Sequence, residues 1–575
     1  MRKQYPIALT FQDYPYQRPD MVQLGTALAT NIQRFAQAAS EIEAQDAMEA
    51  VYQLRADFQT MYNLAYIRHS MDTIDPFYEQ ENDFFDANLP VFEQYKSQFY
   101  QALLDSPFQS YLEAQYGTQL FAIARLSLKT FHPDIITDLQ EENQLSSAYN
   151  KLKATAKVEF NGQTFNLSSI QPLEENLDRN VRSAASRAKW DWMEAHQAEM
   201  EAIFDKLVNV RHRIAQRLGF DNFVALGYAR MLRTDYTPDD VAYYRRQIQE
   251  HIVPVASRLY QEQQRRLGLE QFSFYDEAVS FPDGNPVPQG EPAWIVAQAA
   301  NMYRELSDET HRFFTFMQER QLMDLVSRDG KATGGYCTYI PNERSPFIFS
   351  NFNGTSGDID VLTHEAGHAF QVFSSSDTPI EEYQWPTYEA CEIHSMSMEF
   401  FTWPWMASFF GNKVAQYHYS HLARAIQFLP YGVAVDEFQH FVYENPDCGA
   451  AARNAAWKAI EAKYLPHRNY EGHPMLENGG FWQKQTHIFA MPFYYIDYTL
   501  AQVCAFQFWH KDQQDHATAW ADYVRLCKAG GSRSFLRLVE YANLESPFAA
   551  GCVAKVAGLV DQWLSLQKMP VAVES

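Results

Sequence analysis

Helical periodicity over long stretches is the feature that most constrains the fold of this chain. Apolar residues recur at steps of three and four across residues 22–58 and again across 177–218. This spacing places apolar side chains on one face of an α-helix, which must then pack against another element. The run Thr-Pro-Asp-Asp at 237–240 supplies a cap, a first-position proline and acids for the helix dipole, so another helix should begin there. We therefore predict a mainly α fold.

Signals for β-strands are few and short. Residues 158–165 alternate around Asn161-Gly162, a dipeptide typical of a two-residue hairpin turn. Two further β-type runs, 336–340 and 347–349, lie just before the segment that carries the most chemistry. We therefore expect a small β element near the active site.

The length of the chain allows more than one domain. Its 575 residues, 46% of them hydrophobic, provide ample material for a large core. We assign residues 1–180 to an N-terminal helical region, with a hairpin near 157–167. Residues 181–575 are assigned to a catalytic domain.

The net charge and the cysteines indicate which binding partners and which cellular compartment to expect. With 71 acidic and 47 basic residues the formal net charge is −24, which repels phosphate backbones and anionic lipid headgroups. We therefore expect no nucleic-acid and no membrane partner. The N-terminus has no apolar signal-peptide core, no apolar stretch reaches about 18 residues, and six cysteines are spread singly. These features predict a cytoplasmic protein with free thiols.

Residues 364–368 read His-Glu-Ala-Gly-His, an HExxH motif in a plausible helix. Positions four apart in a helix are separated by about 400°, so His364 and His368 project from one face and can bind one zinc ion. Glu365 lies about 100° away, so it can reach a water at the metal and act as general base. The alternative is two structural histidines on an ordinary helix.

A catalytic zinc usually takes three protein ligands and leaves one position for water. The segment 388–401 offers Glu389, Glu392 and Glu399 on one helical face, inside an apolar sequence where a lone buried carboxylate is costly. Spacing alone does not separate Glu389 from Glu392 as the third ligand. The alternative is a set of surface acids beside a buried Met/Phe stripe.

Other acids could orient the ligand histidines. Asp360 lies one turn before His364, and Glu399 lies two turns along the second helix, so either could accept the outer N–H of a ligand histidine. Glu389 is a third candidate for this contact. His394 should point away from the metal and be structural.

The runs HEAGHAF at 364–370 and EIHSMSMEFF at 392–401 resemble the thimet-oligopeptidase and oligoendopeptidase F family of zinc metallopeptidases, nearest to its bacterial oligoendopeptidase branch. The likeness extends from Arg230 to Tyr498 and is weaker over the first 150 residues. It implies an elongated multi-helix metallopeptidase fold with a deep substrate channel, which admits short unfolded peptides and excludes folded proteins. It also implies one zinc ion per chain.

The resemblance also assigns individual roles. In the family the glutamate that opens the second motif is the third ligand, which is Glu392 here. A His/Tyr set on a glycine-containing loop lies over the family's active site, and His487, Tyr495 and Tyr498 match it best, with a one-residue gap near Met491. These side chains would then donate hydrogen bonds to the oxyanion formed on the scissile carbonyl.

The sequence therefore predicts a zinc metalloendopeptidase, an oligoendopeptidase that hydrolyses internal bonds of short unstructured peptides by metal-activated water. One alternative is a helical zinc carboxypeptidase, which would use the same HExxH chemistry to trim single C-terminal residues. Another is an inactive peptide-binding scaffold that kept the motif.

Overall fold

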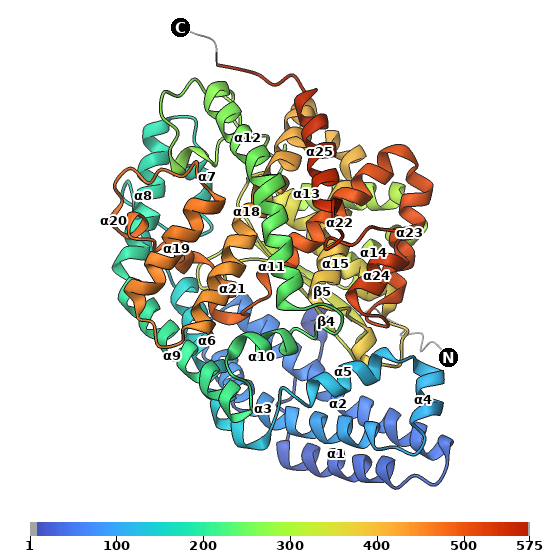
Figure 1. Ribbon diagram of the computed structural model, residues 1–575. Coiled ribbons are helices and arrows are strands. Elements are labelled where there is room, and N and C mark those ends of the chain that lie inside the picture. Colours follow the sequence, from blue (N-terminus) through green and yellow to red (C-terminus); the bar gives the residue numbers. More distant parts are fainter. Residues whose placement is uncertain (1–8, 573–575) are drawn as a thin grey trace.

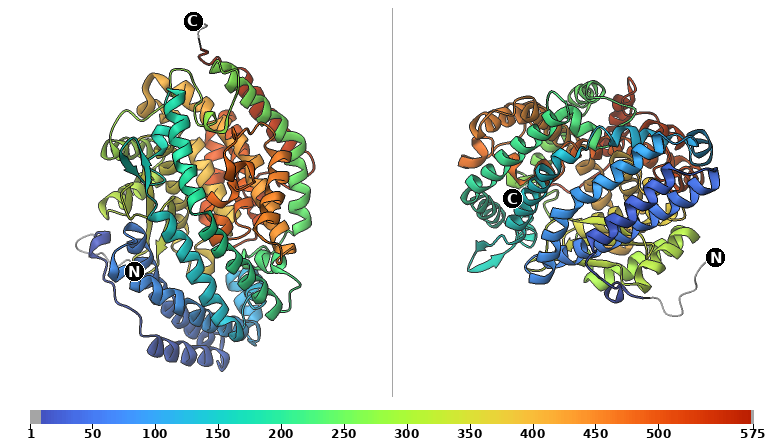
Figure 2. Two further views of the ribbon diagram at one scale, coloured as in Figure 1. Left: turned by 90° about the vertical axis from the view of Figure 1, so that its left-hand side faces the viewer. Right: turned by 90° about the horizontal axis from the view of Figure 1, so that it is seen from below.

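The computed structural model describes residues 9–572, and these are mainly helical, as predicted (Figure 1). The blue N-terminal helices gather at one end of the molecule, and the orange and red helices of the C-terminal half lie above them. The turned view in Figure 2 shows the same arrangement from the side. Within the described residues, no helix has the length and apolar character needed to cross a membrane.

The helices of the N-terminal end form a second hydrophobic core, in which the rings of Phe58 and Phe92 stack and to which Ile380 and Tyr383 also contribute. The single helix predicted over 22–58 is wrong. The first helix ends at Ala36, and the side chain of Ser40 caps a second and longer helix. The helices of this end are α1 (Met21–Ala36), α2 (Glu41–Met71), α3 (Pro76–Leu104), α4 (Gln109–Tyr116) and α5 (Gln119–Ser127).

The hairpin predicted near 157–167 is present. Strands β1 (Val158–Phe160) and β2 (Gln163–Phe165) pair antiparallel, and Asn161 and Gly162 take φ values of 51° and 76° in the turn. These left-handed values are the ones that a two-residue hairpin turn requires. The helix predicted over 177–218 is interrupted at His196, which ends one helix and starts the next. The helices around the hairpin are α6 (Ile136–Ala154), α7 (Gln171–Glu174), α8 (Arg179–Ala195) and α9 (Gln197–Arg217).

Further helices lead to a three-stranded sheet. They are α10 (Phe223–Arg230), α11 (Pro238–Gln247), α12 (Val253–Arg266), α13 (Pro292–Leu306) and α14 (Asp308–Glu319). Helix α11 begins as predicted, with a capping box between Thr237 and Asp240. The two β-type runs predicted at 336–340 and 347–349 are strands β4 (Tyr336–Ile340) and β5 (Ser345–Phe352), which pair antiparallel in a sheet of order β3-β5-β4. Strand β3 (Met323–Val326), which pairs parallel with β5, was not predicted because four residues carry too little periodicity.

The C-terminal half packs around three helices. Helix α16 packs against both α15 and α22 within the largest hydrophobic core. The HExxH segment (364–368), the glutamate segment (389–399) and the tyrosine segment (494–498) are thereby brought together. The helices of this half are α15 (Gly357–Ser375), α16 (Tyr388–Phe401), α17 (Ala407–Phe410), α18 (Val414–Glu444), α19 (Ala450–Tyr464), α20 (Pro474–Glu477), α21 (Thr486–Ala490), α22 (Tyr495–Gln514), α23 (His516–Ala529), α24 (Phe535–Tyr541) and α25 (Cys552–Ser565).

Candidate active site

Two histidines of α15 and one glutamate of α16 meet in space. His364 Nε2 lies 3.1 Å from Glu392 Oε2, and His368 Nε2 lies 3.3 Å from the same oxygen. One ligand atom from each of the three side chains can be chosen so that all lie within 4.8 Å of one another. The structure therefore brings together the three residues that the sequence analysis selected as metal ligands.

A glycine inside the HExxH motif permits this meeting. A Cβ atom on Gly367 would lie 2.6 Å from the Cα of Ser395 and 2.7 Å from the carbonyl oxygen of His394, both on α16. These are backbone atoms, so no side-chain rotation could relieve the overlap. The absent side chain lets α15 and α16 approach closely enough for Glu392 to reach the two imidazoles.

The three side chains fit a zinc ion. Ligands at about 2.1 Å from a tetrahedral ion are about 3.4 Å apart, close to the measured separations. Burial alone would favour a neutral Glu392, but the charge of His368 and hydrogen bonds from both histidines hold its pKa well below the ordinary value. Two imidazole nitrogens and a carboxylate oxygen are donors that zinc accepts in catalytic sites.

Glu399 orients one ligand histidine. Its Oε1 lies 2.7 Å from Nδ1 of His364, which leaves Nε2 of that ring for a metal, and its Oε2 lies 2.8 Å from Nε2 of His421 on α18. The prediction for Asp360 is wrong, because its carboxylate accepts a hydrogen bond from the Tyr417 hydroxyl at 2.7 Å instead. His421 was not predicted, because its helix lies beyond both motifs.

Glu389 does not contact the ligand histidines. Its side chain is fully buried, and within residues 9–572 neither carboxylate oxygen has a hydrogen-bond partner. Burial, followed by the charge of Asp497, raises its pKa to about 8, while Arg233 acts in the opposite direction. Glu392, not Glu389, is the carboxylate of this helix that lies with His364 and His368. His394 is also fully buried, and burial lowers its pKa to about 4, as suits a structural residue.

Glu365 stands beside the histidines with a free carboxylate oxygen. Its side chain lines a large cavity, and its Oε2 has no hydrogen-bond partner among the described residues. Burial raises its pKa, although the neighbouring histidines favour the ionised form. A raised pKa makes this carboxylate a better proton acceptor.

The tyrosine segment reaches the site through Tyr494 and Tyr498. The Tyr494 hydroxyl donates to Glu392 Oε1, and the Tyr498 hydroxyl lies 3.2 Å from Nε2 of His487. Burial lowers the pKa of His487 to about 4 and raises those of both tyrosines, so all three stay neutral near pH 7.

Tyr495 lies differently from the sequence expectation. Its ring centroid lies 5.0 Å from that of His487 and 5.8 Å from those of Phe428 and Tyr431. Tyr495 is nevertheless absent from the cavity lining, which includes Tyr494 and Tyr498. Tyr494, one residue earlier, lines the cavity instead. The four-residue spacing of Tyr494 and Tyr498, which puts both on one helical face, is a signal that could have found the pair.

The site opens into a cavity of about 1880 Å³. Both halves of the chain contribute to its wall: Tyr62 and Tyr66 of α2 lie on one side, with Trp190 of α8, and His364 and Tyr498 lie among the C-terminal helices. A chamber of this size can hold several residues of an extended peptide.

Comparisons with known proteins agree with this geometry. The model of the Peptidase M3 N-terminal domain matches residues 11–131, and that of Peptidase family M3 matches residues 173–280 and 299–557. No curated protein matches the chain.

Three solved structures resemble the chain over almost its whole length. One, described as an oligoendopeptidase F, is 54% identical with a TM-score of 0.97, covering 97% of this chain and 99% of its own. A PZ peptidase A with an inhibitor is 54% identical with a TM-score of 0.96 and the same coverage. A protein from Bacillus anthracis str. Ames, also described as an oligoendopeptidase F, is 52% identical with a TM-score of 0.92, covering 97% of this chain and 98% of its own.

Proposed function

Because the chain belongs to peptidase family M3, we propose that it is a zinc-dependent oligoendopeptidase, which cleaves internal bonds of short unstructured peptides. The observation that carries the proposal is the convergence of His364, His368 and Glu392 beside the free carboxylate of Glu365, on the wall of a large cavity. These three side chains would hold one zinc ion per chain. Zinc there would lower the pKa of a water and polarise the scissile carbonyl.

Glu365 moves the protons of the reaction. Its carboxylate accepts a proton from the attacking water and later passes it to the nitrogen of the leaving amine. The raised pKa supports both halves of this role, since the group must first take the proton and then hold it. Glu399 keeps His364 in one orientation throughout.

Neutral donors stabilise the oxyanion that forms on the scissile carbonyl. We assign this role to His487, Tyr494 and Tyr498, which line the cavity next to the ligand set. Each stays protonated at a donating atom near pH 7. The Tyr494 hydroxyl donates to Glu392 Oε1 here, so it would have to turn to the oxyanion during the reaction. We do not assign this role to Tyr495, because its side chain does not line the cavity.

The cavity supports a limit on substrate size. Its wall is formed by residues from both ends of the chain, so a peptide must lie extended inside it to reach the ligand set. We propose that residues 1–180 supply part of this wall and that residues 181–575 supply the chemistry.

Digestion of an internally quenched peptide with both ends blocked tests the proposal. We expect the zinc-loaded protein to cleave it, whereas an obligate carboxypeptidase needs a free C-terminus and a scaffold releases no fragments. Glu365→Gln should retain zinc and lose at least about 100-fold in kcat. Glu392→Gln should lose both zinc and activity.

Glu389→Gln is the matched control. Glu389 lies on the same helix and is fully buried, and burial raises the pKa of its carboxyl, so the amide is the closest uncharged replacement. It should keep both zinc and activity. Uncleaved blocked peptide, full activity in Glu365→Gln, or zinc loss in Glu389→Gln with retention in Glu392→Gln would each contradict the assignments.

A further inference from the structure

A second cluster of metal-ligating side chains lies away from the active site. Asp191 and Glu194 stand one turn apart on α8, and His473 lies directly before α20. One ligand atom from each can be chosen so that all lie within 4.8 Å of one another, and His473 Nε2 is 3.4 Å from Asp191 Oδ1. We propose that these three side chains bind a second divalent cation.

His473 is the strongest indication of a ligand. Its side chain is only 1% exposed, and neither ring nitrogen has a hydrogen-bond partner among the described residues. A buried polar group without a partner costs free energy that folding normally avoids. An imidazole nitrogen directed at two carboxylates gains that partner when a cation sits between them.

The two carboxylates also lack a neutralising charge. No lysine or arginine forms an ion pair with Asp191 or Glu194 within residues 9–572, although the chain carries a net charge of −24. Like charges three residues apart on a helix repel each other. Both acids lie near the C-terminal end of α8, where the helix dipole disfavours negative charge. One cation relieves both effects.

The donor set defines the class of cation. One imidazole nitrogen with two carboxylate oxygens suits zinc and neighbouring divalent transition ions better than calcium or magnesium, which prefer oxygen ligands alone. The Asp191 side chain is 70% exposed, so this site is open to solvent and should bind more weakly than the buried triad of the active site.

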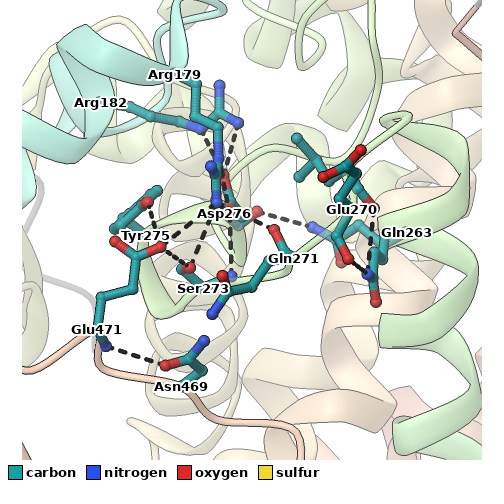
Figure 3. A network of polar contacts seen from close by, with 12 residues as sticks. Arg179, Arg182, Gln263, Glu270, Gln271, Ser273, Tyr275, Asp276, Asn469 and Glu471 are labelled. Carbon is teal, nitrogen blue, oxygen red and sulfur yellow. Dashed lines mark hydrogen bonds and ion pairs between the residues drawn. The ribbon is translucent and has the colours of Figure 1, made fainter.

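The cation would brace one wall of the cavity. Near the start of α8, Arg179 and Arg182 pair with Asp276, and Glu471 accepts hydrogen bonds from Ser273 and Tyr275 (Figure 3). These contacts hold the first turn of α8 close to the loop that contains Glu471. A cation between α8 and His473 would fasten the other end of the same helix.

The two segments that the cation would join also line the cavity. Trp190 of α8 stacks on Phe481, with ring centroids 5.1 Å apart, and both side chains line the cavity. Phe481 lies eight residues after His473 and six before His487. The second cation should therefore raise the stability of this wall without entering the chemical step.

Zinc titration of the full-length protein, with its active site already loaded, tests the proposal by equilibrium dialysis and metal analysis. Asp191→Asn/Glu194→Gln removes the two carboxylate ligands. The matched control is Asp46→Asn/Glu49→Gln, which changes two exposed acids with the same spacing on α2 and the same loss of charge. Thermal unfolding with and without the additional zinc provides a second measurement.

We expect the wild type and the control to bind a second equivalent of zinc, and the zinc to raise their unfolding temperature. The Asp191→Asn/Glu194→Gln variant should bind the second equivalent at least tenfold more weakly and show no such rise. A wild type that saturates at one equivalent would overturn the proposal. So would a variant that keeps the second equivalent unchanged, or a control that loses it equally.

Discussion

Gly367→Ala tests whether close helix packing creates the ligand set. The added Cβ would lie 2.6 Å from Ser395 Cα, about 0.8 Å inside ordinary van der Waals contact, which begins at 3.4 Å. The opposing atoms belong to the backbone of α16, so the helices must separate by a similar distance. Overpacking of this kind costs up to about 3 kcal/mol, and the better helix propensity of alanine returns about 1 kcal/mol. We expect a net destabilisation of about 2 kcal/mol.

The same displacement should weaken metal binding. Metal sites require ligand distances within about 0.2 Å of their ideal values, so a shift several times larger moves Glu392 away from its position beside His364 and His368. We expect zinc affinity to fall at least tenfold. Urea unfolding of the metal-free protein measures the first effect, and competition with a chelator measures the second.

Gly558→Ala is the control for helix propensity. Gly558 lies inside α25 and is exposed, and a Cβ atom there would meet no atom beyond the backbone of its own helix within 4 Å. Alanine at this position should stabilise the protein by about 0.5–1 kcal/mol. If Gly367→Ala were as stable as Gly558→Ala and bound zinc with wild-type affinity, the close approach of α15 and α16 would not be what assembles the site.

Three further predictions concern individual side chains. Glu399→Gln should weaken zinc binding about 10–100-fold in chelator competition, because His364 loses the carboxylate that orients it. Tyr494→Phe should lower kcat at least about 100-fold, whereas Tyr495→Phe should change it less than about threefold, as measured with the blocked peptide. Burial lowers the pKa of Lys153 to about 7. Between this value and the unfolded value of about 10.4 the unfolded state holds more protons, so the stability of the wild type rises with pH by up to about 1.4 kcal/mol per unit. Methionine does not titrate, so the free energy of unfolding of the wild type, measured in urea, should rise relative to that of Lys153→Met across this pH range. Equal losses in the two tyrosine variants, unchanged affinity in Glu399→Gln, or a pH-independent Lys153→Met difference would contradict the respective assignments.

The sequence could predict features that depend on local spacing. The helical class, the hairpin at Asn161-Gly162 and the capped start of α11 each depend on neighbouring residues, and all are present. Helix ends were less predictable. Apolar periodicity continued through Ser40 and His196, because tertiary contacts and caps decide where one helix stops and another begins.

Within the candidate site, the HExxH spacing alone places His364 and His368 on one face of a helix, since helical geometry is set by the backbone. Which carboxylate meets them is a different matter. Glu389 and Glu392 share a face of α16, and only the packing of that helix against α15 and α22 leaves one buried beside Asp497 and brings the other to the histidines. Likewise Tyr494, rather than Tyr495, reaches Glu392 because the position of α22 decides which side of its first turn faces inward. Spacing along the chain thus determined which side chains were candidates for the site. Contacts between distant segments decided which of those candidates meet there.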